Sequence, residues 1–172
     1  MTKQEYFILK FVASVPSIVG RKKLQKLVYL MKFAGVPFEE RYFWHYYGPY
    51  SADLALQIDT LVNKGLLEEK PSIGFEYQIT DTGKNALRQI EKNPANRGVK
   101  THISCWTGDF ADFAQARVSD LEKATSVLFW IDWGKSRIDA IRTAEIQKGK
   151  LTNGASEIVK KALDLRTSDF PT

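Results

Sequence analysis

The feature that most constrains the fold of this chain is a succession of helix and strand patterns between residues 20 and 82. The first pattern is a helix with one apolar face, whose residues recur at the spacing i, i+3, i+4, i+7: Leu24, Leu27, Val28 and Met31. Gly35 and Pro37 end this helix, because neither residue continues one easily. The aromatic residues at 42–47 then predict a short strand.

A second helix is predicted to begin after Ser51, whose hydroxyl can accept a hydrogen bond from the free amides of the first turn. Its apolar face consists of Leu54, Ile58, Leu61 and Val62. Gly65 suits the left-handed position after the last turn. Residues 66–70 and 75–79 read as two strands around a turn at 71–74, and Thr80 is predicted to cap a further helix. Two helices followed by a hairpin and a helix form the skeleton of a winged helix.

The rest of the chain predicts helices on both sides of this unit. Residues 4–14 form a helix pattern that is apolar on most sides, and Asn93, Pro94 and Gly98 predict a linker. Helix patterns resume beyond the linker, and one continuous helical period is expected from Phe110 to Leu128. We therefore expect an α+β fold, predominantly α. It comprises a winged helix-turn-helix domain with an inserted strand (residues 1–92), a linker (93–108) and a C-terminal helical lobe (109–172).

Composition limits where such a protein works. A single cysteine, Cys105, rules out an intramolecular disulfide and fits a reducing cytoplasm. The longest apolar run, residues 127–131, is far shorter than the roughly 20 residues that a membrane helix needs, and the N-terminal stretch lacks a secretory signal. We expect a cytoplasmic protein without membrane contact. Because residues 126–133 are apolar on nearly every side, we also expect a homodimer through the C-terminal lobe.

Three motifs resemble known proteins: KLQKLVYL at residues 23–30, YFWHYYGPYS at 42–51 and NKGLL at 63–67. Their combination is similar to the YwgA-like winged-helix proteins of bacteria and, more loosely, to the Panacea (SocA-like) antitoxin domain. The first family is functionally uncharacterised. The second resemblance implies a protein that neutralises or delivers a partner protein. The similarity covers about residues 20–87 and does not extend beyond residue 96.

DNA binding is the first function that a winged helix suggests, with its second helix in the major groove and its wing on the backbone. The candidate phosphate contacts are Arg21, Lys22, Lys23, Lys26 and Lys64. Three features argue against a routine DNA-binding mode. Residues 35–50 replace the usual turn of about 3–4 residues, Asp53 and Asp59 lie on the outer side of the second helix, and the wing (68–76) is net acidic.

A protein partner is the alternative, with an antitoxin-like or adaptor function in which the partner could be a toxin. Leu56 is predicted to lie opposite the apolar stripe of the second helix, at 100° per residue. Alternate residues of a strand face opposite sides, so the aromatic residues form two sets: Tyr42, Trp44 and Tyr46, and Phe43, His45 and Tyr47. At most one set can line the core. The other must be covered by the C-terminal lobe, a second subunit or a partner. The candidate partner contacts are Trp44, Tyr46, Tyr50, Asp53, Leu56, Asp59 and Asn63.

No motif predicts an enzyme. His102 and Cys105 have a spacing found in metal sites, but two ligands are too few for tetrahedral zinc, and no third group that would orient a Cys–His pair is identified. The acidic residues form no recognisable acid–base pair, and the known glycine-rich phosphate loops are absent. We therefore expect a non-enzymatic regulatory protein without cofactor or metal. DNA binding is the leading expectation and a protein partner the second.

Overall fold

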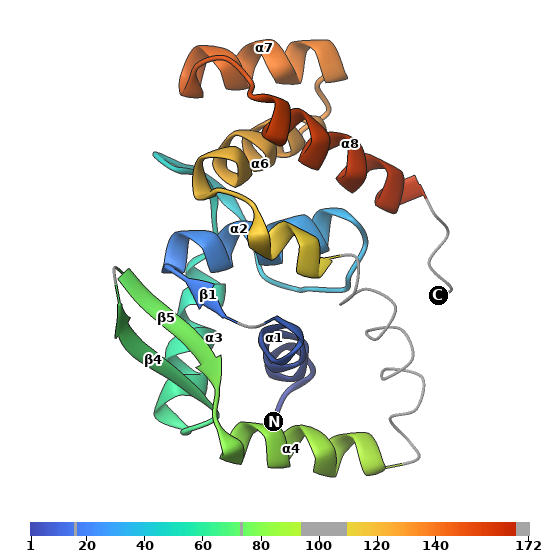
Figure 1. The fold of residues 1–172 in the computed structure, drawn as a ribbon. Helices are drawn as coiled ribbons and strands as arrows, with labels where there is room; N and C mark the ends of the chain where they lie inside the picture. Colours follow the sequence, from blue (N-terminus) through green and yellow to red (C-terminus); the bar gives the residue numbers. More distant parts are fainter. Residues whose placement is uncertain (16, 73, 94–109, 168–172) are drawn as a thin grey trace.

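The computed structural model describes residues 1–15, 17–72, 74–93 and 110–167. These residues form an α+β fold that is predominantly α, as the sequence predicts (Figure 1). The first part of the chain contains α1 (Lys3–Ser14), β1 (Ile18–Val19), α2 (Arg21–Phe33), β2 (Phe43–His45), β3 (Gly48–Tyr50), α3 (Ala52–Asn63), β4 (Leu67–Ser72), β5 (Gly74–Ile79) and α4 (Asp81–Lys92). Residues 110–115 form a short helical segment, and α6 (Val118–Asp132), α7 (Arg137–Lys148) and α8 (Asn153–Thr167) follow.

The strands form two small antiparallel sheets. One has the order β1-β5-β4, in which Tyr77 of β5 lies between Ile18 and Glu69. The other is a hairpin of β2 and β3, with Trp44 opposite Pro49. The single strand predicted at residues 42–47 is therefore wrong in its extent, because the chain turns back after His45. Gly48 permits this turn: its φ of +82° favours glycine, and a Cβ there would lie 2.9 Å from Ser126 Oγ.

The helix boundaries follow local capping. The hydroxyl of Ser51 accepts from the amide of Leu54 at 3.1 Å, and that of Thr80 accepts from Gly83 at 2.9 Å, so both predicted caps are confirmed. The single helical period predicted from residue 110 to 128 is wrong. The chain leaves helical geometry at Arg117, the N-cap of α6, where ψ is 142°. A periodic apolar face therefore continues across a break in the backbone.

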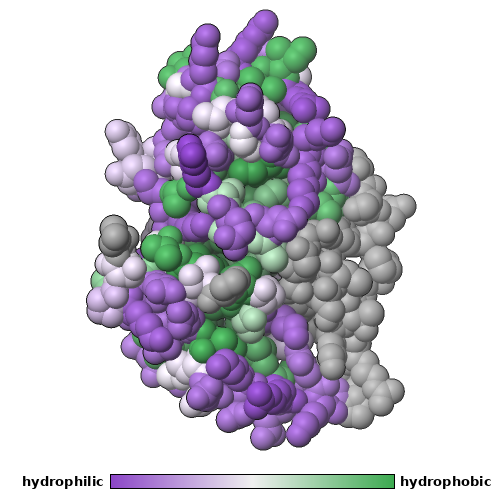
Figure 2. Space-filling view, viewed as in Figure 1, coloured by the Kyte–Doolittle hydropathy of each residue, from purple (hydrophilic) through white to green (hydrophobic). Residues whose placement is uncertain are grey.

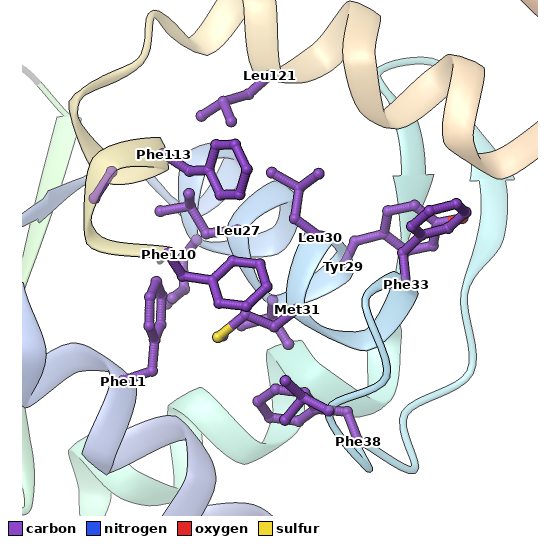
Figure 3. Packing of buried hydrophobic residues seen from close by; sticks show 14 of the residues in the cluster. Phe11, Leu27, Tyr29, Leu30, Met31, Phe33, Phe38, Phe110, Phe113 and Leu121 are labelled. Atoms are coloured by element: carbon purple, nitrogen blue, oxygen red, sulfur yellow. The ribbon is translucent and has the colours of Figure 1, made fainter. Parts of the chain in front are cut away.

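The apolar helix α6 is covered by its own chain. It contacts α2, β3, α7 and α8, and Val127 and Leu128 are fully buried. Phe110 and Phe113, from the segment before α6, pack beside Phe11 of α1 and the apolar residues of α2 (Figure 3). The two parts of the chain therefore share one hydrophobic core. The apolar stripe of α6, which suggested a homodimer, is buried within one molecule.

Candidate functional site

The β2–β3 hairpin has two unlike faces. On one face the ring of Trp44 lies 5.4 Å from that of Phe129 and 5.0 Å from that of Trp130, both on α6 (centroid distances). Tyr42, which precedes the hairpin, packs in the same way on Tyr29 of α2, at 4.9 Å. The C-terminal lobe therefore covers Trp44, and α2 covers Tyr42. Phe43, Tyr46, Tyr47 and Tyr50 remain exposed.

A cavity of about 250 Å³ lies between the second face of the hairpin, the start of α2 and one side of α3. Three rings from the hairpin and two apolar residues from α3 supply most of its wall, and α2 supplies long polar side chains. The lining residues are Arg21, Lys22, Gln25, Lys26, His45, Tyr47, Tyr50, Ala55 and Ile58. We call this space the hairpin cavity.

Lys26 lines the hairpin cavity but is itself only 2% exposed. Its Nζ donates a hydrogen bond to the carbonyl oxygen of Pro49 at 2.7 Å, which ties α2 to β3. Burial lowers the pKa of Lys26 to about 7; Glu122 opposes this shift, while Lys148 and Lys22 add to it. Because a buried ammonium is costly without a close counter-charge, Lys26 belongs to the packed interior rather than to an open cationic surface.

Glu122 of α6 connects the two parts of the molecule. Its carboxylate lies 3.6 Å from Nζ of Lys22 and 3.1 Å from Nζ of Lys148. Lys22 also lies over the ring of Tyr47, at 3.5 Å from the centroid, and Lys148 donates to the carbonyl oxygen of Tyr46. The tip of the hairpin is thus held by lysines from α2 and α7. This arrangement fixes the exposed rings at the surface.

The five cations proposed as phosphate contacts have different environments. Arg21 pairs with Asp59 at 2.5 Å and with Glu69 at 3.3 Å, and it also donates to the hydroxyl of Tyr77. Lys64 pairs with Glu5 of α1 at 2.7 Å. Lys22 and Lys26 are engaged as described above, and burial lowers the pKa of the half-buried Lys23. Of these cations, Arg21, Lys22 and Lys64 already have carboxylate partners within the chain.

The residues proposed as partner contacts do not form one surface. Trp44 is partly buried because its ring packs against α6. Tyr50 lines the hairpin cavity, and Tyr46 is exposed at the turn of the hairpin. The remaining four lie together on the solvent side of α3, which we call the outer face of α3: Asp53, Leu56, Asp59 and Asn63.

The outer face of α3 has an apolar centre among paired charges. Leu56 is 69% exposed, as the helical wheel predicts. Asp53 lies 3.5 Å from Arg41, and Asp59 pairs with Arg21. Both carboxylates that the sequence predicts on this side of the helix therefore have arginine partners from elsewhere in the chain.

Within the described part of the chain, no group of three or more His, Cys, Asp or Glu side chains is placed to hold a metal ion. No helix in that same part has both the length and the apolar character needed to cross a membrane. His102 and Cys105 lie outside the described residues.

The chain is similar to a known bacterial protein. That protein is the uncharacterized protein YwgA of Bacillus subtilis (strain 168), which is 43% identical over 88 residues. The matched part covers 48% of this chain and 53% of the relative, so the chain spans about half the length of the relative that it matches. The predicted resemblance to YwgA-like uncharacterised proteins is thereby confirmed. No family model matches the chain.

Proposed function

We propose that this chain is a non-enzymatic regulatory protein that is built on a winged helix and binds a protein partner through the outer face of α3. The order of elements supports the winged helix: α1, β1, α2 and α3 precede the β4–β5 hairpin, and β1 joins the same sheet. In that arrangement α3 occupies the place of the recognition helix, and β4–β5 that of the wing. The β2–β3 hairpin is an insertion between the two helices.

The observation that carries this proposal is the environment of Leu56. Isolated exposed apolar residues are common on protein surfaces, and on the side shown in Figure 2 apolar side chains reach the surface in patches among hydrophilic ones. Leu56 differs in its position, because it occupies the middle of the helix that a winged helix uses for recognition. An uncharged centre with neutralised carboxylates at its edges fits a protein groove better than it fits a phosphate backbone.

Site-specific photo-crosslinking tests this proposal. Replacement of Leu56 by p-benzoylphenylalanine in the full chain, in the cells that naturally produce it, should give one dominant protein adduct. The matched control places the same group at Ile146 of α7, which is 87% exposed, and it should not give that adduct. If position 56 yields no specific protein adduct, or the same adducts as position 146, the partner surface is not on α3.

DNA binding is the second candidate, and the position of α3 as a recognition helix favours it. The phosphate contacts would then come from the start of α2. The double substitution Lys22→Glu and Lys23→Glu should weaken binding to random duplex DNA and reduce the slope of log affinity against log salt by about one for each lost contact. Unchanged affinity in this variant, with helicity retained by circular dichroism, would remove this candidate.

A homodimer in the cytoplasm, and a toxin as the partner, also remain proposals. Since the apolar stripe of α6 is buried, a dimer through the C-terminal lobe would use its exposed apolar residues instead. These are Trp133 at the end of α6 and Ile138 and Ile146 on α7. Two-fold symmetry would bring the same patch of both copies together. These exposed residues therefore replace the buried stripe as the basis for a dimer.

A further inference from the structure

We propose that the hairpin cavity is an anchor site for one aromatic side chain of the partner, carried by a segment in which carboxylates flank the ring. This inference rests on the proposed partner-binding function and adds the chemistry of the partner. The cavity borders α3 along Ala55 and Ile58, one turn or less from the outer face residues Leu56 and Asp59. A segment lying along α3 could therefore reach both places.

The size of the cavity limits its occupant. Sites for drug-sized ligands have volumes of about 300–1,000 Å³, whereas this cavity measures about 250 Å³. That volume suits one ring with little else. A single ring contributes most to binding free energy when it is the buried anchor of a larger interface. Tryptophan and tyrosine commonly have this role at hot spots. Size therefore admits one aromatic side chain of a protein partner.

The wall of the cavity complements a ring. The rings of His45 and Tyr50 lie 5.4 Å apart at an angle of 40°, and Tyr47 lies beside His45 at 6.5 Å. Ala55 and Ile58 of α3 form the opposite apolar side. Offset or tilted ring pairs with centroids 4.5–7 Å apart are the favourable aromatic arrangement. An inserted ring would thus extend a cluster that already has this geometry.

The charges of the lining indicate carboxylates next to that ring. Arg21 and Lys22 are the exposed cations of the lining, whereas Lys26 is buried on the carbonyl of Pro49, and no lining residue is Asp or Glu. The side chains of Arg21 and Lys22 are 47% and 38% exposed; Arg21 pairs with Asp59 and Glu69, and Lys22 pairs with Glu122. The Arg21–Asp59 pair is exposed on both sides, so water screens it and it contributes little to stability. Carboxylates of a partner can therefore share these cations at small cost.

Short peptides test the anchor site without knowledge of the partner. The ¹⁵N-labelled full chain is titrated with acetyl-Glu-Trp-Glu-amide, acetyl-Lys-Trp-Lys-amide and acetyl-Glu-Ala-Glu-amide. The first should bind with a millimolar Kd and shift the amide signals of Tyr50, Ala55 and Ile58. The second should bind about fivefold or more weakly, because its charges repel the lining cations. The third should cause no shifts at these residues.

Two alanines of α3 provide a matched pair of variants. Ala55→Leu fills the cavity and should abolish the shifts, whereas Ala52→Leu, at an exposed position outside the lining, should leave them unchanged. Leucine is a good helix former, and the dispersion of the NMR spectrum verifies that each variant is folded. If Ala55→Leu does not fold, Ala55→Met replaces it.

The outcomes separate this inference from the proposed function. Failure of both tryptophan peptides to shift the cavity signals, equal affinity for the two of them, or shifts that persist in Ala55→Leu would overturn the anchor site. A specific adduct at position 56 would in that case still support a partner on α3. Loss of that adduct together with normal peptide binding would overturn the function and leave a cavity that binds aromatic residues.

Discussion

The helices α6 and α3 both carry more apolar surface than one stripe, but they differ in what happens to it. Phe129 of α6 is buried against Tyr29 of α2 and Trp44 of β2, so other parts of the chain cover the apolar stripe of that helix. On α3, Leu54, Ile58 and Leu61 face the core, while Leu56 remains in solvent. The difference between the two helices teaches that apolar residues outside the main stripe of a helix indicate a binding surface only where the folded chain leaves them exposed. Substitutions on α6 should therefore change folding, and substitutions at Leu56 should change binding.

The largest expected effect is in the interior of α6. Phe129→Ala removes a buried ring and leaves a cavity between the two parts of the molecule, which should lower the free energy of unfolding by about 3–5 kcal/mol. Chemical denaturation measures this change. The control Lys160→Ala, at an exposed site on α8, should stay within about 0.5 kcal/mol of the unsubstituted protein. Equal effects at the two sites would mean that the C-terminal lobe does not cover α6 in solution.

A smaller effect is expected beneath the hairpin, at Lys26. Its folded pKa of about 7 is below the ordinary lysine value of 10.5, so the unfolded chain binds more protons between these values. Stability should therefore rise as pH increases from about 7 to 10, by at most about 1.4 kcal/mol per pH unit. Lys26→Met should flatten this rise and leave the carbonyl of Pro49 unpaired, at a cost of about 1–3 kcal/mol. A variant that keeps the same pH dependence would show that Lys26 is solvated.

Glu40, in the loop between α2 and β2, should give a pH dependence of stability opposite to that of Lys26. It is 1% exposed, and neither of its carboxylate oxygens, nor Oε1 of Gln57, has a hydrogen-bond partner among the described residues. Burial raises the pKa of Glu40, so its contribution is present at low pH and is lost as pH rises through the folded pKa. Glu40→Gln should remove that loss, and the exposed neighbour Glu39→Gln should not. Melting curves between pH 4 and 8 measure the difference.

The sequence predicted elements whose signals are local. The helix patterns around Leu24 and Leu54, the caps at Ser51 and Thr80 and the exposure of Leu56 depend on residues within a few turns of one another. Spacing alone was sufficient for these predictions. The return of the chain after His45 was missed because an aromatic run has no polar turn residues before Gly48.

The candidate site was only partly predictable for a different reason. The cations at the start of α2 were recognised, but their partners are far away in sequence: Asp59 and Glu69 for Arg21, and Glu122 for Lys22. A free basic cluster and a neutralised one look the same until these distances are known. The hairpin cavity, likewise, is lined by residues from α2, from the β2–β3 hairpin and from α3. No pattern within one helix or strand carries that information.

The exposed apolar residues of α7 give a weaker test of whether uncovered apolar surface indicates binding. If Ile138 and Ile146 on α7 are a dimer surface, Ile146→Glu should shift the mass measured by light scattering at micromolar concentration from dimer to monomer, with little change in monomer stability. A monomer mass for the unsubstituted chain would show that exposure on α7 has no such role.

The most direct test of the central claim combines binding and stability in one protein. p-Benzoylphenylalanine is placed at Asn63, on the outer face of α3, with either Leu56 or the substitution Leu56→Arg in the same chain. The account predicts that Leu56→Arg lowers the yield of the partner adduct about tenfold, equivalent to about 1.4 kcal/mol of binding free energy. The free energy of unfolding should stay within about 0.5 kcal/mol. An unchanged adduct yield, or a yield lost only because the protein unfolds, would contradict the claim that Leu56 on α3 contacts a protein partner.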